Sequence, residues 1–251
     1  MPELTLAFML LTINRTARTL LQTYLGSDAA ERVLAGNIVR GRAEPIRAVV
    51  WFSDLVGYTR ISDSLGADGV LALLNDYAEA QVEEIETHGG HVLKFMGDGI
   101  LAIFPDADTT LACKQALDAA AKLRHRIAAL NVQRKATGLP VTDTHLALHV
   151  GELLYGNVGS RRRLDFTVLG SAVNEASRIE ALCNSLDQPV IVSWAFAEAA
   201  GESRKLLVSL GRYAMKGIAR PQELFTLDPV EIEAAIDSDS SGVAGPLSPH
   251  R

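Results

Sequence analysis

The sequence has few cysteines, no long hydrophobic run and no excess of positive charge, and each absence excludes a class of protein. Its two cysteines, Cys113 and Cys183, lie in apolar, helix-like surroundings without the spacing of metal ligands. We therefore expect free, buried thiols in a reducing, cytoplasmic compartment and no disulfide framework. The 24 Lys and Arg residues against 30 Asp and Glu give a formal charge of −6, which argues against a protein that coats nucleic acid. A small anionic ligand held by a few cationic side chains is compatible with this charge.

The N-terminal apolar run, Leu4–Ile13, is well short of the roughly 20 residues that a membrane-spanning helix needs. It has no basic stretch before it and no small-residue cleavage site, which argues against a secretory signal. We expect a helix to about Tyr24 that packs against a partner chain or an upstream domain, with an ordinary amphipathic helix as the alternative. A second helix follows to about Leu34, and the charged, Gly-containing loop Gly36–Pro45 marks a boundary. Residues 1–42 are therefore assigned to a helical and linker segment.

The rest of the chain has enough apolar residues, 48% over 251 positions, for one domain with a substantial core. Hydrophobic periodicity predicts helices over Asp68–His88 and Asp108–Arg134, and Ser171 and Ser193 are each expected to cap a further helix. The segment Leu55–Thr59 is expected to be a turn. The expected strands are short apolar or alternating runs bounded by turn residues: Ile46–Asp54, the two arms of His91–Phe104, Thr144–Val150, Glu152–Val158, Leu164–Leu169, Pro189–Val192, Leu206–Leu210 and Glu223–Leu227.

The order of these elements predicts an α+β fold. Its core is a ferredoxin-like βαββαβ unit with a mixed, mostly antiparallel sheet and extra C-terminal strands. We assign residues 43–227 to this domain. Residues 228–251 are rich in Asp, Ser, Gly and Pro, which predicts a disordered tail.

The hairpin His91–Phe104 is predicted from two apolar runs joined by a Gly-Asp-Gly turn. Alternation along its first strand would place Val92, Lys94 and Met96 on one face. A lysine on such a face requires a partner, because an unpaired charge is unfavourable there. Asp98, at the tip of the turn, is an acidic residue whose flanking glycines allow other groups to approach closely.

Two acidic residues, Asp54 and Asp98, each lie at the end of a predicted central strand. Neighbouring strands would bring both carboxylates together, and paired carboxylates are hard oxygen ligands suited to Mg²⁺ or Mn²⁺ carrying a phosphate substrate. Taken singly, each aspartate is more simply explained as a turn residue. The remaining motifs decide between the two interpretations.

Four collinear motifs resemble the catalytic domains of class III nucleotidyl cyclases: FSDLVGYT (Phe52 to Thr59), KFMGDGILAIF (Lys94 to Phe104), FTVLGSAVNEASRIE (Phe166 to Glu180) and MKG (Met215 to Gly217). The resemblance runs from about Ala43 to Leu227, and four motifs in the same order make a chance match very improbable. Thr167 stands where many adenylyl cyclases have Asp, a departure that resembles the class IIIb subgroup.

This resemblance implies that Asp54 and Asp98 bind two divalent cations, Mg²⁺ or Mn²⁺, which assist attack of the ribose 3′-hydroxyl on the α-phosphate. It also implies that Lys94 donates to adenine N1, at a position where guanylyl cyclases carry Glu. Guanine presents N1–H there and would oppose a lysine. The Thr167 hydroxyl can still accept a hydrogen bond from the adenine N6 amine, so ATP is the expected substrate.

The side chains of Asn174 and Arg178 are spaced i and i+4, so they share one helix face, although a solvated polar face has the same spacing. By resemblance, Asn174 positions the ribose and Arg178 stabilises the charge that develops on the pentavalent α-phosphate. Lys216 matches a lysine that contacts the terminal phosphates. Without the other motifs it would be interpreted as a turn lysine before Gly217.

The resemblance further implies a C2 homodimer, in which the metal-binding aspartates of one protomer face the nucleotide-binding residues of the other. We therefore expect an adenylyl cyclase that makes 3′,5′-cyclic AMP and pyrophosphate, with the leading helix transmitting a signal from an upstream sensor domain. A guanylyl or mixed-specificity cyclase stays open, as does a silent nucleotide-binding or dimerisation module. A DNA-binding regulator is disfavoured, because no recognition-helix motif is present. The basic run Arg161–Arg163 is expected to be an exposed turn, with a dimer or phosphate contact as the alternative.

Overall fold

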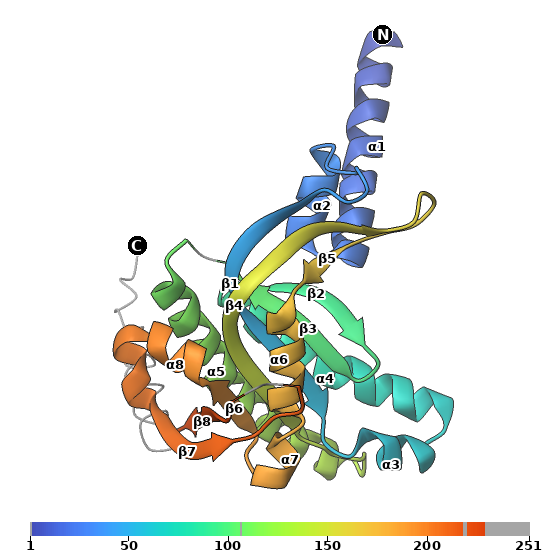
Figure 1. Ribbon diagram of the computed structural model, residues 1–251. Coiled ribbons are helices and arrows are strands. Elements are labelled where there is room, and N and C mark those ends of the chain that lie inside the picture. Colours follow the sequence, from blue (N-terminus) through green and yellow to red (C-terminus); the bar gives the residue numbers. More distant parts are fainter. Residues whose placement is uncertain (1, 106, 218–219, 229–251) are drawn as a thin grey trace, which may run out of the picture.

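The structure is a computed structural model that describes residues 2–105, 107–217 and 220–228. Figure 1 shows a curved sheet with helices against both faces and the N-terminal helix projecting from one end. The helices are α1 (Pro2–Leu25), α2 (Ser27–Leu34), α3 (Tyr58–Asp63), α4 (Ala67–Thr87), α5 (Thr109–Ala136), α6 (Ser171–Glu180), α7 (Cys183–Leu186), α8 (Trp194–Ala199) and the 3₁₀ helix η1 (Gly201–Leu206). The predicted tail lies outside the described residues from position 229 onward.

The strands are β1 (Ala43–Leu55), β2 (His91–Met96), β3 (Gly99–Phe104), β4 (Thr144–Gly159), β5 (Leu164–Leu169), β6 (Val190–Ser193), β7 (Leu207–Tyr213) and β8 (Gln222–Leu227). Over the described residues they form one eight-stranded sheet in the order β2-β3-β1-β4-β6-β8-β7, with β5 paired to β4. β4 and β6 are parallel and the other pairs are antiparallel. The run β1-α4-β2-β3-α5-β4 is the predicted βαββαβ core, which is confirmed.

The strand β4 is one continuous strand, whereas the sequence predicted two strands separated at Gly151. Gly151 lies inside the ladder, opposite Ala48 of β1. A Cβ atom at this position would lie 2.4 Å from the Cβ of Ala172, the second residue of α6. The glycine therefore allows α6 to approach the sheet closely and does not interrupt the strand.

Three further boundaries differ from the predictions. β1 begins at Ala43, so the expected loop to Pro45 ends earlier. The segment expected to be a simple turn after Asp54 contains the short helix α3. Ser171 is the first residue of α6 and not its cap. The helix begins after Gly170, and no side chain caps its first turn. Ser193 does cap α8, since its hydroxyl accepts a hydrogen bond from the Phe196 amide.

Different helices cover the two faces of the sheet. On one face α4, α5 and α8 cover side chains that include Trp51, Phe104 and Leu148. On the other face α2 and α6 cover a set that includes Val50, Tyr155 and the β5 residues Phe166 and Val168. Burial of these apolar side chains supplies the main driving force for folding. The helix α6 consequently lies flat across β1 and β4 (Figure 1).

The N-terminal segment is attached to the sheet through α2. The Tyr155 hydroxyl of β4 donates a hydrogen bond to Asp28 (2.7 Å), and the Arg32 guanidinium stacks 4.9 Å from the centre of the Tyr155 ring. Burial is the largest cause that raises the pKa of Tyr155, and the neighbouring Asp28 adds to it. By contrast, most of α1 extends beyond the sheet (Figure 1). Among the described residues, no helix has the length and apolar character needed to cross a bilayer.

Cys113 and Cys183 are free and buried, which confirms the prediction for both thiols.

Candidate active site

The carboxylates of Asp54 and Asp98 meet at the end of the β1–β3 pair. Asp54 is the penultimate residue of β1, and Asp98 lies in the turn between β2 and β3. The register pairs Ser53 with Ile100, so the turn is held beside the end of β1. Gly99 allows this approach, because a Cβ there would lie 2.6 Å from the Ser53 carbonyl oxygen and 3.3 Å from Asp54 Oδ1. The predicted meeting of the two aspartates is therefore present in the folded chain.

The proximity of the two carboxylates makes it unfavourable for both to be ionised. Burial, a hydrogen bond between the two side chains and the charge of Asp98 raise the pKa of Asp54 to about 7. The charge of the Glu180 carboxylate acts in the same direction, with a smaller effect. A divalent cation would remove this repulsion, and Mg²⁺ or Mn²⁺ is typically held by one or two carboxylates together with substrate phosphates. The donor set thus fits such a cation. No cluster of three or more His, Cys, Asp or Glu with metal-binding geometry occurs among the residues described.

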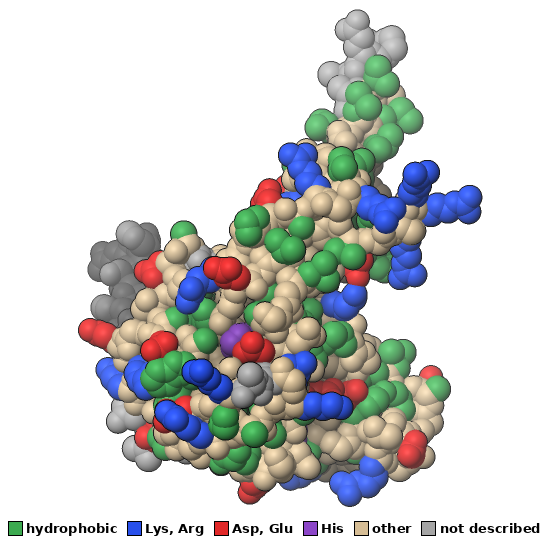
Figure 2. Space-filling model, viewed as in Figure 1, with side chains coloured by type: hydrophobic (Ala, Val, Ile, Leu, Met, Phe, Trp, Pro, Cys, Tyr) green, Lys and Arg blue, Asp and Glu red, His purple; other side chains and the backbone are tan. Residues whose placement is uncertain are grey.

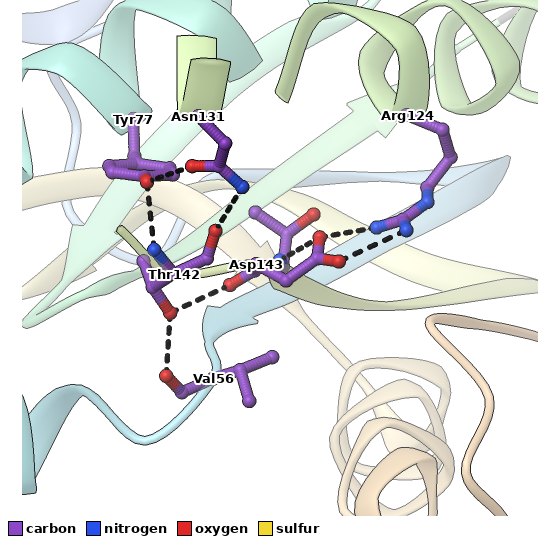
Figure 3. Close-up of polar contacts among 7 residues, drawn as sticks. Val56, Tyr77, Arg124, Asn131, Thr142 and Asp143 are labelled. Carbon is purple, nitrogen blue, oxygen red and sulfur yellow. Dashed lines mark hydrogen bonds and ion pairs between the residues drawn. The ribbon is translucent and has the colours of Figure 1, made fainter. Parts of the chain in front are cut away.

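The chain following Asp54 is anchored by a buried polar network (Figure 3). The Thr142 hydroxyl donates to the Val56 carbonyl (2.6 Å), and the Thr142 amide donates to the Tyr77 hydroxyl (2.8 Å). Tyr77 donates in turn to Asn131, whose amide group donates to the Thr142 carbonyl (2.7 Å). The network ties the end of β1 to α4, α5 and the start of β4. Its members were not singled out from the sequence, because contacts between distant segments leave no local pattern.

A second anchor lies next to Thr142. Arg124 of α5 forms a bidentate ion pair with Asp143, and the Asp143 carbonyl accepts a hydrogen bond from the Val56 amide (2.9 Å). Planar guanidinium–carboxylate pairs of this kind are directional as well as strong. Both backbone polar groups of Val56 are therefore satisfied, which fixes the turn two residues beyond Asp54.

A β-bulge in β2 sets the direction of Lys94. The register with β3 shifts between Val92 and Lys94, so Val92 packs with the α4/α5 face while Leu93 and Met96 pack with the α2/α6 face. The prediction that Val92 shares a face with Lys94 and Met96 was therefore wrong. One extra residue in a strand reverses the alternation beyond it, and sequence alternation alone does not reveal it.

Lys94 has a carboxylate partner on β5. Its ammonium group forms an ion pair with Asp165, and both side chains are about half exposed. Thr167, two residues further along β5, is buried. Because Phe166 and Val168 face the α2/α6 core, Asp165 and Thr167 share the opposite face of β5. The sequence indicated that Lys94 requires a partner but did not identify Asp165.

The helix α6 carries Asn174, which is exposed, and Arg178, which is partly buried. Arg178 lies against the turn of the MKG motif: a Cβ on Gly217 would approach its guanidinium nitrogens to 3.3 and 3.4 Å. Gly217 adopts φ +76°, a conformation that favours glycine. Lys216, directly before it, is exposed. The structure therefore brings Arg178 and the Lys216 turn together, although they belong to two motifs that are far apart in the sequence.

The C-terminal end of α6 approaches the Asp54–Asp98 pair of the same chain. Burial and the nearby Asp98 charge raise the pKa of Glu180. His145, the register partner of Asp54, has its Nδ1 3.9 Å from Glu180 Oε1. Glu180 ends one of the four motifs, yet nothing in the sequence indicated that it faces the aspartate pair.

The basic turn Arg161–Arg163 is exposed, as predicted. Figure 2 shows Lys and Arg side chains gathered around the projecting tip of the β4–β5 hairpin. None of these three arginines forms an ion pair within the part of the chain that the structure describes.

Comparison with known proteins identifies the family. Residues 42–228 match the adenylate and guanylate cyclase catalytic domain. Adenylate cyclase 1 of Rhizobium meliloti is 30% identical over 195 residues, covering 77% of this chain but only 29% of that protein. The chain thus spans less than a third of this relative.

Solved structures agree on the fold. The adenylyl cyclase CyaB from P. aeruginosa superposes with a TM-score of 0.67 at 25% identity, covering 74% of this chain and 96% of that one. The guanylyl cyclase Cya2 superposes with a TM-score of 0.64 at 27% identity, over 74% and 95% of the two chains. Class III cyclases generally use divalent metals, which agrees with the donor set at Asp54 and Asp98. The chain belongs to the class III adenylate and guanylate cyclase catalytic domain family.

Proposed function

We propose that this chain is an adenylyl cyclase that converts ATP to 3′,5′-cyclic AMP and pyrophosphate. The observation that carries the proposal is the contact between Asp54 and Asp98, two carboxylates held together at the end of the neighbouring strands β1 and β3. The family supports cyclisation, and the names of the R. meliloti and P. aeruginosa relatives favour ATP over GTP.

In this proposal Asp54 and Asp98 hold Mg²⁺ or Mn²⁺. Two such cations would assist ionisation of the ribose 3′-hydroxyl and neutralise phosphate charge. Asn174 orients the ribose, and Arg178 donates to the α-phosphate oxygens as negative charge accumulates on them. Lys216 binds the terminal phosphates. A guanidinium suits the α-phosphate because it presents several donors in a fixed plane.

We assign adenine recognition to Lys94 and Thr167. The Lys94 ammonium donates to adenine N1, and the Thr167 hydroxyl accepts from the N6 amine. This combination resembles the class IIIb subgroup. The ion pair that Lys94 makes with Asp165 supports the assignment, because it holds the ammonium group near β5.

The active site is proposed to be shared between two copies of the chain related by C2 symmetry. A cavity of about 220 Å³ lies beside the metal pair, and its lining includes Asp98, Leu71 and Phe95. Leu71 and Phe95 are each 59% exposed. Apolar side chains this exposed beside a charged centre are covered when a second protomer docks there. The partner then supplies Asn174, Arg178 and the adenine-binding residues.

Within this scheme residues 43–227 form the catalytic domain, and residues 1–42 form a helical segment that links it to a sensor or to the partner. Exposed apolar side chains on α1 recur at alternating spacings of three and four residues: Leu6, Leu10, Ile13, Leu20 and Tyr24, with Ala17 between them. This spacing is typical of a seam between paired helices. Deletion of residues 1–25 should weaken dimerisation or change basal activity. No change in either would exclude this role for α1.

The proposal is tested by mixing two inactive variants. Asp54→Ala removes a metal ligand, and Arg178→Ala removes the transition-state cation, so each homodimer should be inactive. In an equimolar mixture, heterodimers contain one site with both lesions and one intact site. Statistical pairing makes half of the dimers heterodimers, so about a quarter of wild-type activity should return. ATP and GTP are compared as substrates, each with Mg²⁺ and Mn²⁺.

Each alternative function predicts a different result. Faster turnover of GTP than of ATP would favour a guanylyl or mixed-specificity cyclase. Absence of product with every nucleotide and metal, in a preparation that is dimeric and binds nucleotide, would favour a binding or dimerisation module. Inactive single variants whose mixture stays inactive would contradict the shared site.

A further inference from the structure

The ion pair between Lys94 and Asp165 joins two segments that carry different parts of the proposed adenine site. Lys94 is on β2 beyond the bulge, and Asp165 is on β5. Asp165 lies on the same face of β5 as Thr167, at the spacing of one strand repeat, about 7 Å. The lysine therefore has a fixed acidic partner one repeat from the residue assigned to the adenine amine.

The solvent exposure of this ion pair limits its contribution to stability and leaves it accessible to a ligand. The side chains of Lys94 and Asp165 are 43% and 46% exposed. Exposed ion pairs contribute little to the free energy of unfolding, because water screens the charges and both side chains lose freedom. A ligand can also reach both groups at this exposure. The geometry of the pair therefore has more consequence for a bound base than for the stability of the chain.

Lysine needs such a partner if it is to select a base. Its ammonium is a point charge on a flexible four-carbon chain, so it can donate in many directions. Adenine presents an acceptor at N1, whereas guanine presents N1–H there and an acceptor at O6. An unrestrained lysine can move from the N1 position to guanine O6. A lysine held by a carboxylate is restricted to one position.

We infer that Asp165 is a positioning residue that acts through Lys94 and thereby determines the preference for adenine over guanine. This inference rests on the proposed cyclase function. It assigns to Asp165 a role that the family motifs leave to Lys94 and Thr167 alone. Loss of the carboxylate releases the ammonium, which weakens its bond to N1 and permits a bond to O6.

The test compares Asp165→Asn with the wild-type chain, measuring kcat and KM for ATP and for GTP. Asn keeps the size of the side chain but removes its charge. We expect the ATP-to-GTP ratio of kcat/KM to fall about tenfold, mainly through KM, as for loss of a charge-assisted hydrogen bond. Asp165→Glu should retain most of the preference. Asp118→Asn is the matched control, since Asp118 forms an exposed ion pair with Lys114 on α5.

A double-mutant cycle separates positioning from independent effects. In the Lys94→Ala background, Asp165→Asn should leave the ATP-to-GTP ratio unchanged, because there is no lysine to position. A further decrease in that background would overturn the inference. An unchanged ATP-to-GTP ratio in the single variant Asp165→Asn would also overturn the inference, whatever its melting temperature. The ion pair would then only connect β2 with β5 structurally.

Equilibrium binding keeps this inference distinct from the proposed function. Calorimetric titration with ATP and with GTP measures the same preference without turnover. A wild-type chain that binds ATP better than GTP but forms no cyclic product would remove the proposed reaction, while the effect of Asp165→Asn on the two affinities would still decide the inference. A wild-type chain that binds neither nucleotide would overturn both.

Discussion

Asp54 and Asp98 touch within one chain, whereas the residues proposed to hold the nucleotide are divided among β2, β5, α6 and the Lys216 turn. The proposed metal half of the site, formed by Asp54 and Asp98, is built from two adjacent strands and one tight turn. Buried hydrogen bonds fix the chain beyond Asp54 through Thr142 and Tyr77. The proposed nucleotide half has no such common support within the described residues. Its cationic side chains Lys94 and Arg178 contact separate neighbours, Asp165 and Gly217.

The two halves of the proposed site differ in how much they depend on the rest of the molecule. A rigid carboxylate pair presents the same geometry whether or not a nucleotide is present, so it can hold a cation in advance. The nucleotide half depends on the relative placement of several elements, and in the proposed dimer it also depends on the partner. Small movements there have large effects, because misplacement by about 1 Å can reduce a rate about a hundredfold. Regulation would therefore act through the nucleotide half.

The largest expected effect is the loss of activity caused by Gly217→Ala, which perturbs the proposed nucleotide half. The new methyl group would press on the Arg178 guanidinium at 3.3–3.4 Å, and φ +76° is unfavourable for alanine. We expect kcat to fall at least about tenfold, because Arg178 no longer reaches the α-phosphate. Steady-state kinetics with ATP measures this change. Metal binding at the Asp54 pair should be unaffected.

Gly138→Ala is the matched control for this substitution. Gly138 has φ +72°, nearly the same as Gly217, but among the described residues no atom beyond its chain neighbours lies within 4 Å of the position that a Cβ would occupy. It therefore reproduces the backbone strain without the contact. Equal losses of activity in both variants would mean that strain, and not displacement of Arg178, is responsible.

A smaller effect is expected when the support of the metal half is weakened. Tyr77→Phe removes the hydroxyl that accepts from the Thr142 amide, leaving a buried N–H group without its partner. The free energy of unfolding should fall by about 1–3 kcal/mol. Urea denaturation measures the loss. The ATP-to-GTP ratio should stay unchanged, because Lys94 and Asp165 are not part of this network.

Tyr213→Phe serves as the comparison for Tyr77→Phe. Its hydroxyl donates one local hydrogen bond to the Leu210 carbonyl (2.9 Å) in the C-terminal hairpin. The loss of stability there should be smaller, since no buried donor is left unpaired. A shift in nucleotide preference with Tyr77→Phe would show that the two halves are not independent.

The sequence predicted the meeting of Asp54 and Asp98 but not the partner of Lys94, for a physical reason. Asp54 and Asp98 end neighbouring strands, so local strand and turn signals suffice to bring them together. The pairing of Lys94 with Asp165 depends on a bulge and on the path of β5, which long-range pairing sets. Gly151 was misread for the same reason: a glycine that admits a helix and a glycine that ends a strand look alike in sequence.

The fold as a whole was predicted through its periodicity. Helical and alternating patterns located most elements within a few residues, and their order predicted the βαββαβ core. The α3 helix was missed because six residues carry too little periodic signal. The network around Thr142 and the contact of Gly217 with Arg178 join residues far apart in the chain, so no local pattern encodes them.

The smallest expected effect is the pH dependence of stability that Asp54 causes. An unfolded aspartate loses its proton at about pH 4, whereas folding raises the pKa of Asp54 to about 7. Between these values the folded chain binds more protons than the unfolded chain, so Asp54 makes the free energy of unfolding decrease as pH rises. Burial lowers the pKa of His145 and His149, so these residues have the opposite effect as pH falls below the ordinary histidine value of about 6.5.

The contribution of Asp54 is therefore measured as a difference, by urea denaturation of the wild-type chain and of Asp54→Asn between pH 5 and 8 with a chelator present. We expect the advantage of Asp54→Asn to grow as pH approaches 7, with Asp118→Asn showing no such trend. Adding Mn²⁺ at pH 7.5 should stabilise the wild-type chain and not Asp54→Asn, since the cation replaces the shared proton between the carboxylates. A constant difference across this range would mean that Asp54 and Asp98 do not repel each other, and the metal half would then lack the preformed charge that distinguishes it from the nucleotide half.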